Sequence, residues 1–258
     1  MLEYGISVIV PTHNQGFMIG DVLRSIINNC SELVRELIVI LDGCVDNSRE
    51  EVIKATMEFN GYFQMYSLNN VNEVLASNDG ARRARSKYIM FVQDDMIIQE
   101  KDFDKRLLKP FEIIPNLLAV SGRDSADARI TNDTIDYYNL EGKDKNSPKN
   151  IFYVRDVINR GPLLLDHEKF KELEYFDEEF APIDSDDADL SFRAYQKGYL
   201  VGSYWIDYKS DLLWGKTRNN YESNKIWEKS MIKNHKLLIK RHKDFLNGEK
   251  HSFQLIIE

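Results

Sequence analysis

The clearest pattern along the chain is a short apolar run followed by apolar residues spaced three or four apart, and it repeats through residues 1–100. The short runs have the length and β-branched content of buried strands, and the stretches between them have the periodicity of amphipathic helices. The predicted strands are 6–10, 36–41, 62–68 and a run that ends at Val92. A helix is predicted to start near Ile19, and Ser48-Arg49-Glu50-Glu51 has the form of a capping box that opens another, over 48–59. Strands that alternate with helices predict an α/β fold with a parallel, doubly wound sheet.

The second half of the chain has a less regular pattern. The stretch 123–150 is rich in Asn, Asp, Lys and Gly, and we expect a long loop or insertion there. The tail from Tyr221 to Phe245 has apolar residues at helical spacing among many lysines, which predicts a long amphipathic helix. Its default partner is the domain itself, with a membrane surface or another subunit as alternatives. The remaining expected elements are helices over 102–114 and 188–197 and strands over 117–121, 151–157 and 163–165.

Polar residues follow three of the predicted strands at the point where each strand ends. Pro11-Thr12-His13-Asn14, Asp42 and Asp94-Asp95 occupy these positions. Ligands of parallel sheets bind at the carboxyl ends of the strands, so we expect these residues at one ligand-binding edge. The adjacent carboxylates of Asp94 and Asp95 would repel each other, and a divalent cation would relieve that repulsion. An exposed acidic turn is the equally weighted alternative.

A second acidic cluster, Asp184-Ser185-Asp186-Asp187-Ala188-Asp189, precedes the helix predicted over 188–197. Acidic residues at a helix start ordinarily cap the helix and compensate its dipole. Four acids in six residues exceed that need. We therefore expect a functional role for at least one of them, and a carboxylate in a cleft that faces a metal–phosphate site could serve as a general base toward an acceptor hydroxyl.

Composition excludes several classes of protein. The 258 residues carry a net charge of −8, which argues against a uniformly basic surface for nucleic acid. Two cysteines, Cys30 and Cys44, are too few for a disulfide framework and suit a reducing cytoplasm. Neither a signal peptide nor an apolar run long enough to span a membrane is evident, so we expect a cytoplasmic protein that contacts membranes at most peripherally. The sequence also lacks GxGxxG after the first strand, a GxxxxGK[ST] loop and HExxH.

Four segments in order resemble the successive blocks of family 2 glycosyltransferases with the GT-A fold: ISVIVPTHN, ELIVILDGCVDNS, NDGARRARSKYIMFVQDDM and APIDSDDADLSFRAYQKGY. The resemblance implies a Rossmann-like, mostly parallel central sheet flanked by helices. It divides the chain into a GT-A domain over 1–220, with a nucleotide-binding half (1–100) and an acceptor half (101–220), and a helical tail over 221–258 packed on that domain. It also implies inverting transfer of a sugar from a nucleotide-diphosphate donor, UDP-sugar favoured, to a glycan, glycolipid or polysaccharide acceptor.

The resemblance also assigns roles to individual residues. Asp187 matches the catalytic base, and Asp95 matches the acid that binds Mn²⁺ or Mg²⁺. The residues that match contacts to the nucleotide or donor are Pro11, Thr12, His13, Asn14, Asp42, Asn78, Asp94 and Asp186.

The chain departs from the family pattern at several positions. Leu41 and Gln93 stand where the family has acids, Ser77 stands where it has an arginine, and no histidine occurs between His167 and His235 as a further metal ligand. Lys216 or Arg218 could instead close over the diphosphate.

Two other functions remain open from the sequence. A sugar nucleotidyltransferase has a similar sheet, but its glycine-rich basic signature is missing near the N-terminus. A non-catalytic nucleotide-sugar-binding module would explain the missing acid and histidine. The glycosyltransferase interpretation requires Asp42, Asp95 and Asp187 to line one crevice.

Overall fold

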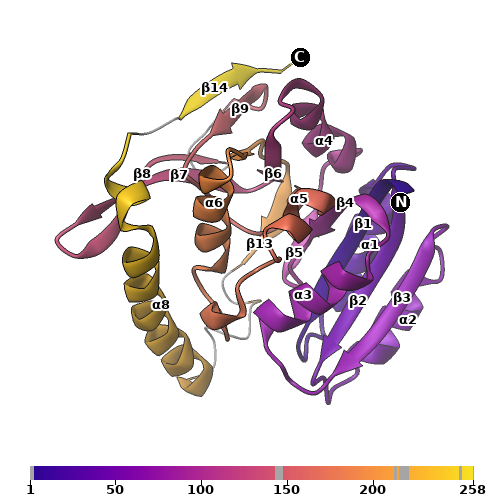
Figure 1. Cartoon of the computed structure of the whole chain (residues 1–258). Coiled ribbons are helices and arrows are strands. Elements are labelled where there is room, and N and C mark those ends of the chain that lie inside the picture. Colours follow the sequence, from indigo (N-terminus) through magenta and orange to yellow (C-terminus); the bar gives the residue numbers. More distant parts are fainter. Residues whose placement is uncertain (1–2, 143–147, 212–213, 215–220, 250–251, 258) are drawn as a thin grey trace.

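The computed structural model describes residues 3–142, 148–211, 214, 221–249 and 252–257. Nine strands form one central sheet in the order β14-β9-β12-β6-β11-β4-β1-β2-β3 (Figure 1). Seven of the nine strands were predicted close to their observed positions. The strands of this sheet are β1 (Glu3–Thr12), β2 (Val34–Asp42), β3 (Tyr62–Leu68), β4 (Ser86–Phe91), β6 (Leu117–Ser121), β9 (Ile151–Val154), β11 (Leu163–Asp166), β12 (Leu200–Ser203) and β14 (Phe253–Ile256).

The sheet is parallel in its N-terminal part and mixed beyond it. Strands β3, β2, β1 and β4 pair in parallel, in register from Ser7 opposite Glu36 to Thr12 opposite Leu41 along β1 and β2. Strand β11 then inserts antiparallel between β4 and β6, and β12 resumes the direction of β6. The prediction of an α/β fold with a Rossmann-like sheet is therefore confirmed.

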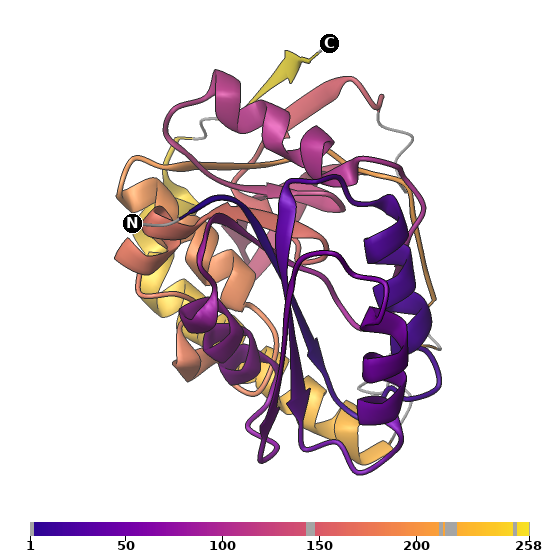
Figure 2. The same ribbon diagram turned by 90° about the vertical axis from the view of Figure 1, so that its right-hand side faces the viewer.

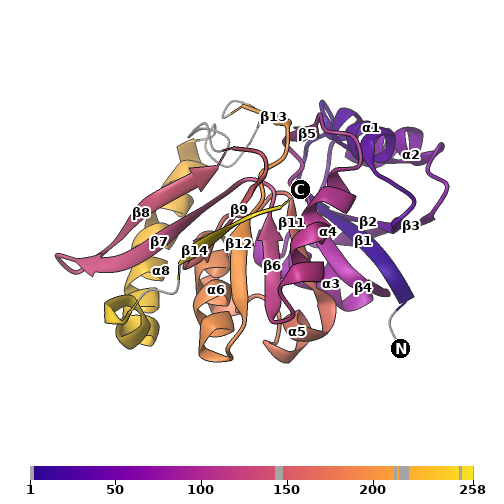
Figure 3. The same cartoon turned by 90° about the horizontal axis from the view of Figure 1, so that it is seen from above.

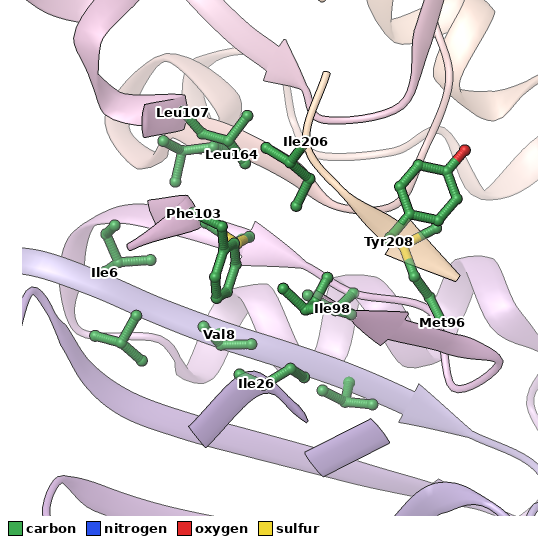
Figure 4. Packing of buried hydrophobic residues seen from close by; sticks show 14 of the residues in the cluster. Ile6, Val8, Ile26, Met96, Ile98, Phe103, Leu107, Leu164, Ile206 and Tyr208 are labelled. Atoms are coloured by element: carbon green, nitrogen blue, oxygen red, sulfur yellow. The ribbon is translucent and has the colours of Figure 1, made fainter. Parts of the chain in front are cut away.

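Helices cover both faces of this sheet, because buried residues alternate along its strands. Val8 and Val10 face one hydrophobic layer and Ile9 faces the other. Figure 4 shows the first layer, where Phe103 lies over Val8 and Leu107 lies beside Leu164. Figures 2 and 3 show the sheet between the two sets of helices. The first set is α1 (Ile19–Asn29), α2 (Ser48–Thr56) and α4 (Phe103–Ile113), and the second is α3 (Glu73–Arg83), α5 (His167–Glu172) and α6 (Asp186–Gln196).

The capping-box prediction at Ser48 was correct for the helix start and wrong for the cap. Asn47 is the N-cap residue, and the Ser48 hydroxyl instead donates to Asp46 Oδ1 at 2.5 Å. The helix also ends at Thr56 rather than at residue 59.

The predicted loop over 123–150 is wrong for most of its length. Strands β7 (Asp124–Thr131) and β8 (Thr134–Gly142) form an antiparallel hairpin, and β10 (Val157–Ile158) joins β7 to complete a three-stranded sheet. The two-residue turn places Asn132 and Asp133 at φ 50° and 58°, which these residue types tolerate. The polar composition concealed the strands because much of the hairpin is exposed.

The C-terminal part contains the expected helix, α8 (Tyr221–Asn247), with a kink at His242. It packs through Leu238 and Leu246 on α6 and the hairpin, so self-packing is observed. His242, at the kink, is buried and only 4% exposed, although a lysine-rich helix suggests solvated polar side chains. Strand β14 then adds an unpredicted edge to the sheet by pairing with β9.

Three short elements complete the described fold: β5 (Met96–Ile98), β13 (Tyr208–Ser210) and the 3₁₀ helix η2 (Glu178–Phe180). Among the described residues, no helix is both apolar enough and long enough to span a bilayer.

Candidate active site

The ends of β1, β2 and β4 meet at one edge of the sheet through His13. The His13 backbone N–H donates to Asp94 Oδ2 at 3.1 Å, and its Nδ1 lies 2.5 Å from the carbonyl oxygen of Asp42. The ring itself is exposed. Pro11 and Thr12 close β1 beside it, and Asn14 Oδ1 accepts the Val45 N–H at 2.8 Å. The sequence-predicted strand-end residues are thus brought together.

Asp42 organises the loop that leads into α3. It is 4% exposed, and its two carboxylate oxygens accept the backbone N–H groups of Val71 and Asn72 at 2.7 and 2.8 Å. Gly43 has φ +62°, and a Cβ at this position would lie 2.6 Å from the Cβ of Asn70. Glycine at this position lets the backbone after β2 come close to Asn70. The Asp42 carboxylate then fixes the loop before α3 at the ligand edge of the sheet.

Three carboxyl groups, those of Glu73, Asp94 and Asp95, lie within electrostatic range of one another beyond β4. Withdrawal from water, followed by the charge of Asp95, raises the pKa of Asp94 to about 7. Burial also raises the pKa of Glu73, in the first turn of α3, and the charges of Asp186 and Asp95 add to that rise. Glu73 therefore lies within electrostatic range of both acidic clusters that the sequence contains.

Arg160, from the loop between β10 and β11, joins these clusters. Its guanidinium pairs with Asp186 and lies 3.3 Å from both Glu73 Oε1 and Ser77 Oγ. Its backbone N–H donates to Asp187 Oδ2 at 3.3 Å. The side chain is 7% exposed, and the cation compensates charges that would otherwise repel.

Gly161 fixes the loop after Arg160 against the loop after β4. It has φ +86°, and a Cβ there would lie 2.8 Å from Gln93 Oε1. The segment Gln93-Asp94-Asp95 consequently lies beside the residues that contact Asp187. The structure brings the two acidic clusters to the same side of the molecule.

Asp187, in the first turn of α6, has surroundings that favour its protonated form. Withdrawal from water and the adjacent Asp186 raise its pKa to about 7, against the opposing charge of Arg160. Its Oδ1 accepts the Ala188 N–H at 2.9 Å, at the start of α6. Tyr137 of the hairpin lies within electrostatic range, since burial and then the charges of Asp187 and Asp184 raise the pKa of its hydroxyl.

The acids after β4 suit a divalent cation that the substrate helps to bind. Within the part of the chain that the structure describes, no three His, Cys, Asp or Glu side chains converge tightly enough to hold a metal ion alone. Mg²⁺ and Mn²⁺ commonly take one or two protein carboxylates and complete their shells with phosphate oxygens and water. Asp95, with Asp94 beside it, offers that donor set.

Other expected residues have different surroundings. Asn78 is fully buried, and its amide bonds the backbone of Phe176 through both Nδ2 and Oδ1, at 2.8 and 3.1 Å. This amide therefore supports the segment that precedes η2. Lys216 and Arg218 lie outside the described residues.

Sequence reasoning missed Glu73, Arg160 and Tyr137. Gly161-Pro162 is typical of a turn after Arg160. The contact between Arg160 and Glu73, however, joins residues 87 positions apart and leaves no local signal in the sequence. Tyr137 lay in the stretch that was predicted as a loop.

Residues 7–172 match the model of Glycosyl transferase family 2, which is more than half of the chain. The chain belongs to this family. Two Staphylococcus aureus relatives are each 25% identical. The poly(ribitol-phosphate) β-N-acetylglucosaminyltransferase TarP of strain N315 aligns over 57% of this chain and 40% of its own. The poly-β-1,6-N-acetyl-D-glucosamine synthase of strain COL aligns over 76% of this chain and 47% of its own. The family 2 chain thus spans less than half the length of these relatives.

Solved structures share the fold of this family 2 chain. GalNAc-T7 with UDP, GalNAc and Mn²⁺ superposes with a TM-score of 0.69 at 14% identity, over 95% of this chain and 50% of that one. The mannosyltransferase PcManGT from Pyrobaculum calidifontis, with GDP-Man and Mn²⁺, gives 0.63 at 15% identity, over 95% and 65%. The prediction of a family 2 glycosyltransferase with the GT-A fold is confirmed.

Proposed function

We propose that this glycosyltransferase inverts the anomeric carbon as it moves a sugar from a nucleotide-diphosphate donor, UDP-sugar favoured, to a glycan, glycolipid or polysaccharide acceptor. The observation that carries the proposal is the joining of two acidic clusters by Glu73 and Arg160 at the sheet edge. One cluster suits a cation and a diphosphate, and the other contains a carboxyl group poised near neutrality. A metal-assisted, inverting sugar transfer uses both features side by side.

The main groups of the site have separate tasks in this proposal. Residues 11–14 and the loop held by Asp42 bind the nucleoside. Asp187 accepts the proton of the acceptor hydroxyl as that oxygen attacks the anomeric carbon, and the bond to the diphosphate breaks on the opposite face. Arg160 keeps Asp186 and Asp187 oriented through its guanidinium and its backbone N–H. A Mg²⁺ or Mn²⁺ ion held by Asp95 would stabilise negative charge on the leaving diphosphate.

Binding and product analysis test this proposal. Thermal shift with UDP-sugars and GDP-mannose should show stabilisation that requires Mn²⁺, and turnover should release nucleoside diphosphate. Asp95→Ala should lose the Mn²⁺-dependent part of the shift, whereas Asp244→Ala on the exposed side of α8 should keep it. Release of pyrophosphate would instead identify a nucleotidyltransferase. If the thermal shift of Asp244→Ala is the same with and without Mn²⁺, as in Asp95→Ala, nucleotide binding does not depend on the metal and the role of Asp95 is refuted.

A further inference from the structure

Helix α8 lies outside the family match, yet one of its side chains holds the turn that leads to Asp187. Asn234 is fully buried, and its Nδ2 donates to the carbonyl oxygens of Phe180, Asp184 and Ile183 at 2.8, 2.9 and 3.1 Å. Phe180 ends η2, and Ile183 and Asp184 belong to the turn between η2 and α6. A single amide group thus pairs with three backbone carbonyl groups of this buried to partly buried segment.

This segment has an unfavourable backbone conformation. Asp184 and Ser185 have φ values of 83° and 70°, in the left-handed region that residues with a Cβ seldom adopt. Each such residue costs about 1–3 kcal/mol and persists only when its surroundings determine its conformation. Ser185 is the N-cap residue of α6, so its conformation determines how the first turn of α6, which carries Asp187, is oriented relative to the preceding segment.

Further contacts tie α8 to both sides of this turn. His242 Nε2 lies 2.8 Å from Oδ1 of Asp189, which is fully buried in α6. Arg241 pairs with Asp177 at 2.6 Å and with Glu179, upstream of the turn. Helix α8 therefore contacts both the segment before Asp187 and α6, the helix that contains Asp187.

We propose that Asn234 is a positioning residue, which fixes the turn over 180–185 so that Asp187 meets the acceptor beside Arg160. The inference rests on the proposed function and extends it to a residue that does not touch substrate. It assigns to α8 a part in catalysis rather than in packing alone.

The decisive variant is Asn234→Asp, which keeps the size of the side chain and removes its N–H donors. Asn247→Asp makes the same change at an exposed position of the same helix. We expect kcat of Asn234→Asp to fall about ten- to a hundredfold, because small misplacements of reacting groups have effects of this size. The nucleotide Kd should stay unchanged, and the pH dependence of kcat should shift with the surroundings of Asp187. If kcat and the pH profile match those of Asn247→Asp, the proposal is wrong.

A second variant and a second measurement separate the proposal from a folding defect and from failure of the proposed function. Asn234→Ser keeps one donor in a smaller volume, and it should lower kcat even if Asn234→Asp does not fold. Full activity of Asn234→Ser would overturn the proposal. Amide hydrogen exchange over 183–189 should accelerate in the Asn234 variants without any substrate. Unchanged exchange would contradict the proposal that Asn234 fixes this turn. If the wild type transfers no sugar but exchange still accelerates in the Asn234 variants, the proposed function is wrong and the role of Asn234 in fixing the turn is supported.

Discussion

Arg160 is the residue on which the electrostatics of the site depend most. It lies between Glu73 and Asp186, and its side chain is 7% exposed. Removing one partner of a buried ion pair leaves the other charge uncompensated in a poorly solvated place. Arg160 therefore contributes to folding as well as to the orientation of the acids.

We predict that Arg160→Met lowers the free energy of unfolding by about 3–5 kcal/mol at pH 8 and by less at pH 5. Burial raises the pKa of Glu73 already in the wild type, and loss of the cation raises it further. An acid whose folded-state pKa exceeds its unfolded-state pKa binds protons on folding, so the variant regains stability as the pH falls. Urea unfolding at both pH values measures this. The exposed Arg129→Met should change little at either pH, and an equal loss for Arg160→Met at both values would contradict the prediction.

We predict that Asp187→Asn lowers turnover by about 10²–10⁴-fold while nucleotide affinity is retained. The asparagine keeps the size of the side chain but cannot accept the proton. In the wild type, kcat should rise between pH 6 and pH 8, as the carboxyl with a pKa of about 7 ionises. Steady-state kinetics and nucleotide titration test both expectations. Asp133→Asn in the hairpin turn is the matched control, and near-normal turnover of Asp187→Asn would reject the assigned base.

Single residues differ in how far the sequence predicts them. Asp42 and Asp95 follow apolar runs, so their place at a sheet edge is a local property of the chain. Glu73 occupies the first turn of a helix, where an acid is ordinary. Its contact with Arg160 depends on how β11 inserts beside β4, which no local pattern encodes.

The hairpin of β7 and β8 is the element whose sequence signal was weakest. Its composition indicates a loop, but its register from Thr131 opposite Thr134 leaves only Asn132 and Asp133 in the turn. Both have positive φ, which matches the twist of a two-residue hairpin. The turn residues, rather than hydrophobic alternation, were the signal available in the sequence.

We predict that Asp133→Ile lowers the free energy of unfolding by about 1–2 kcal/mol, because a branched side chain is strained at φ 58°. Asp133→Gly should be neutral or slightly stabilising at the same position. Urea unfolding of the two variants and the wild type gives the comparison. An isoleucine variant as stable as the wild type would show that the turn adopts another conformation in solution.

The whole molecule has two layers around the sheet and a third hydrophobic cluster outside it. The third cluster joins the hairpin, η2, α6 and α8 through residues such as Phe192 and Leu238. The N-terminal sheet was predictable because each strand and helix carries its own periodicity. The third cluster was not predictable, because its residues come from segments between 128 and 246 that are far apart in the chain, and no local pattern shows that they pack together.

We predict that Leu238→Ala loosens the third hydrophobic cluster without loosening β1 and β2 of the sheet. Leu238 is fully buried in the third cluster, and Leu164, also fully buried, lies in the layer beneath the sheet. Each truncation should cost about 2–5 kcal/mol locally. Hydrogen exchange should accelerate in α6, α8 and the hairpin of Leu238→Ala, with β1 and β2 still protected and nucleotide affinity retained, while transfer falls because α6 carries Asp187. In Leu164→Ala the loss of protection should reach β1 and β4, since β11 pairs directly with β4. A uniform loss of protection in Leu238→Ala would mean that the third cluster and the sheet unfold as one unit.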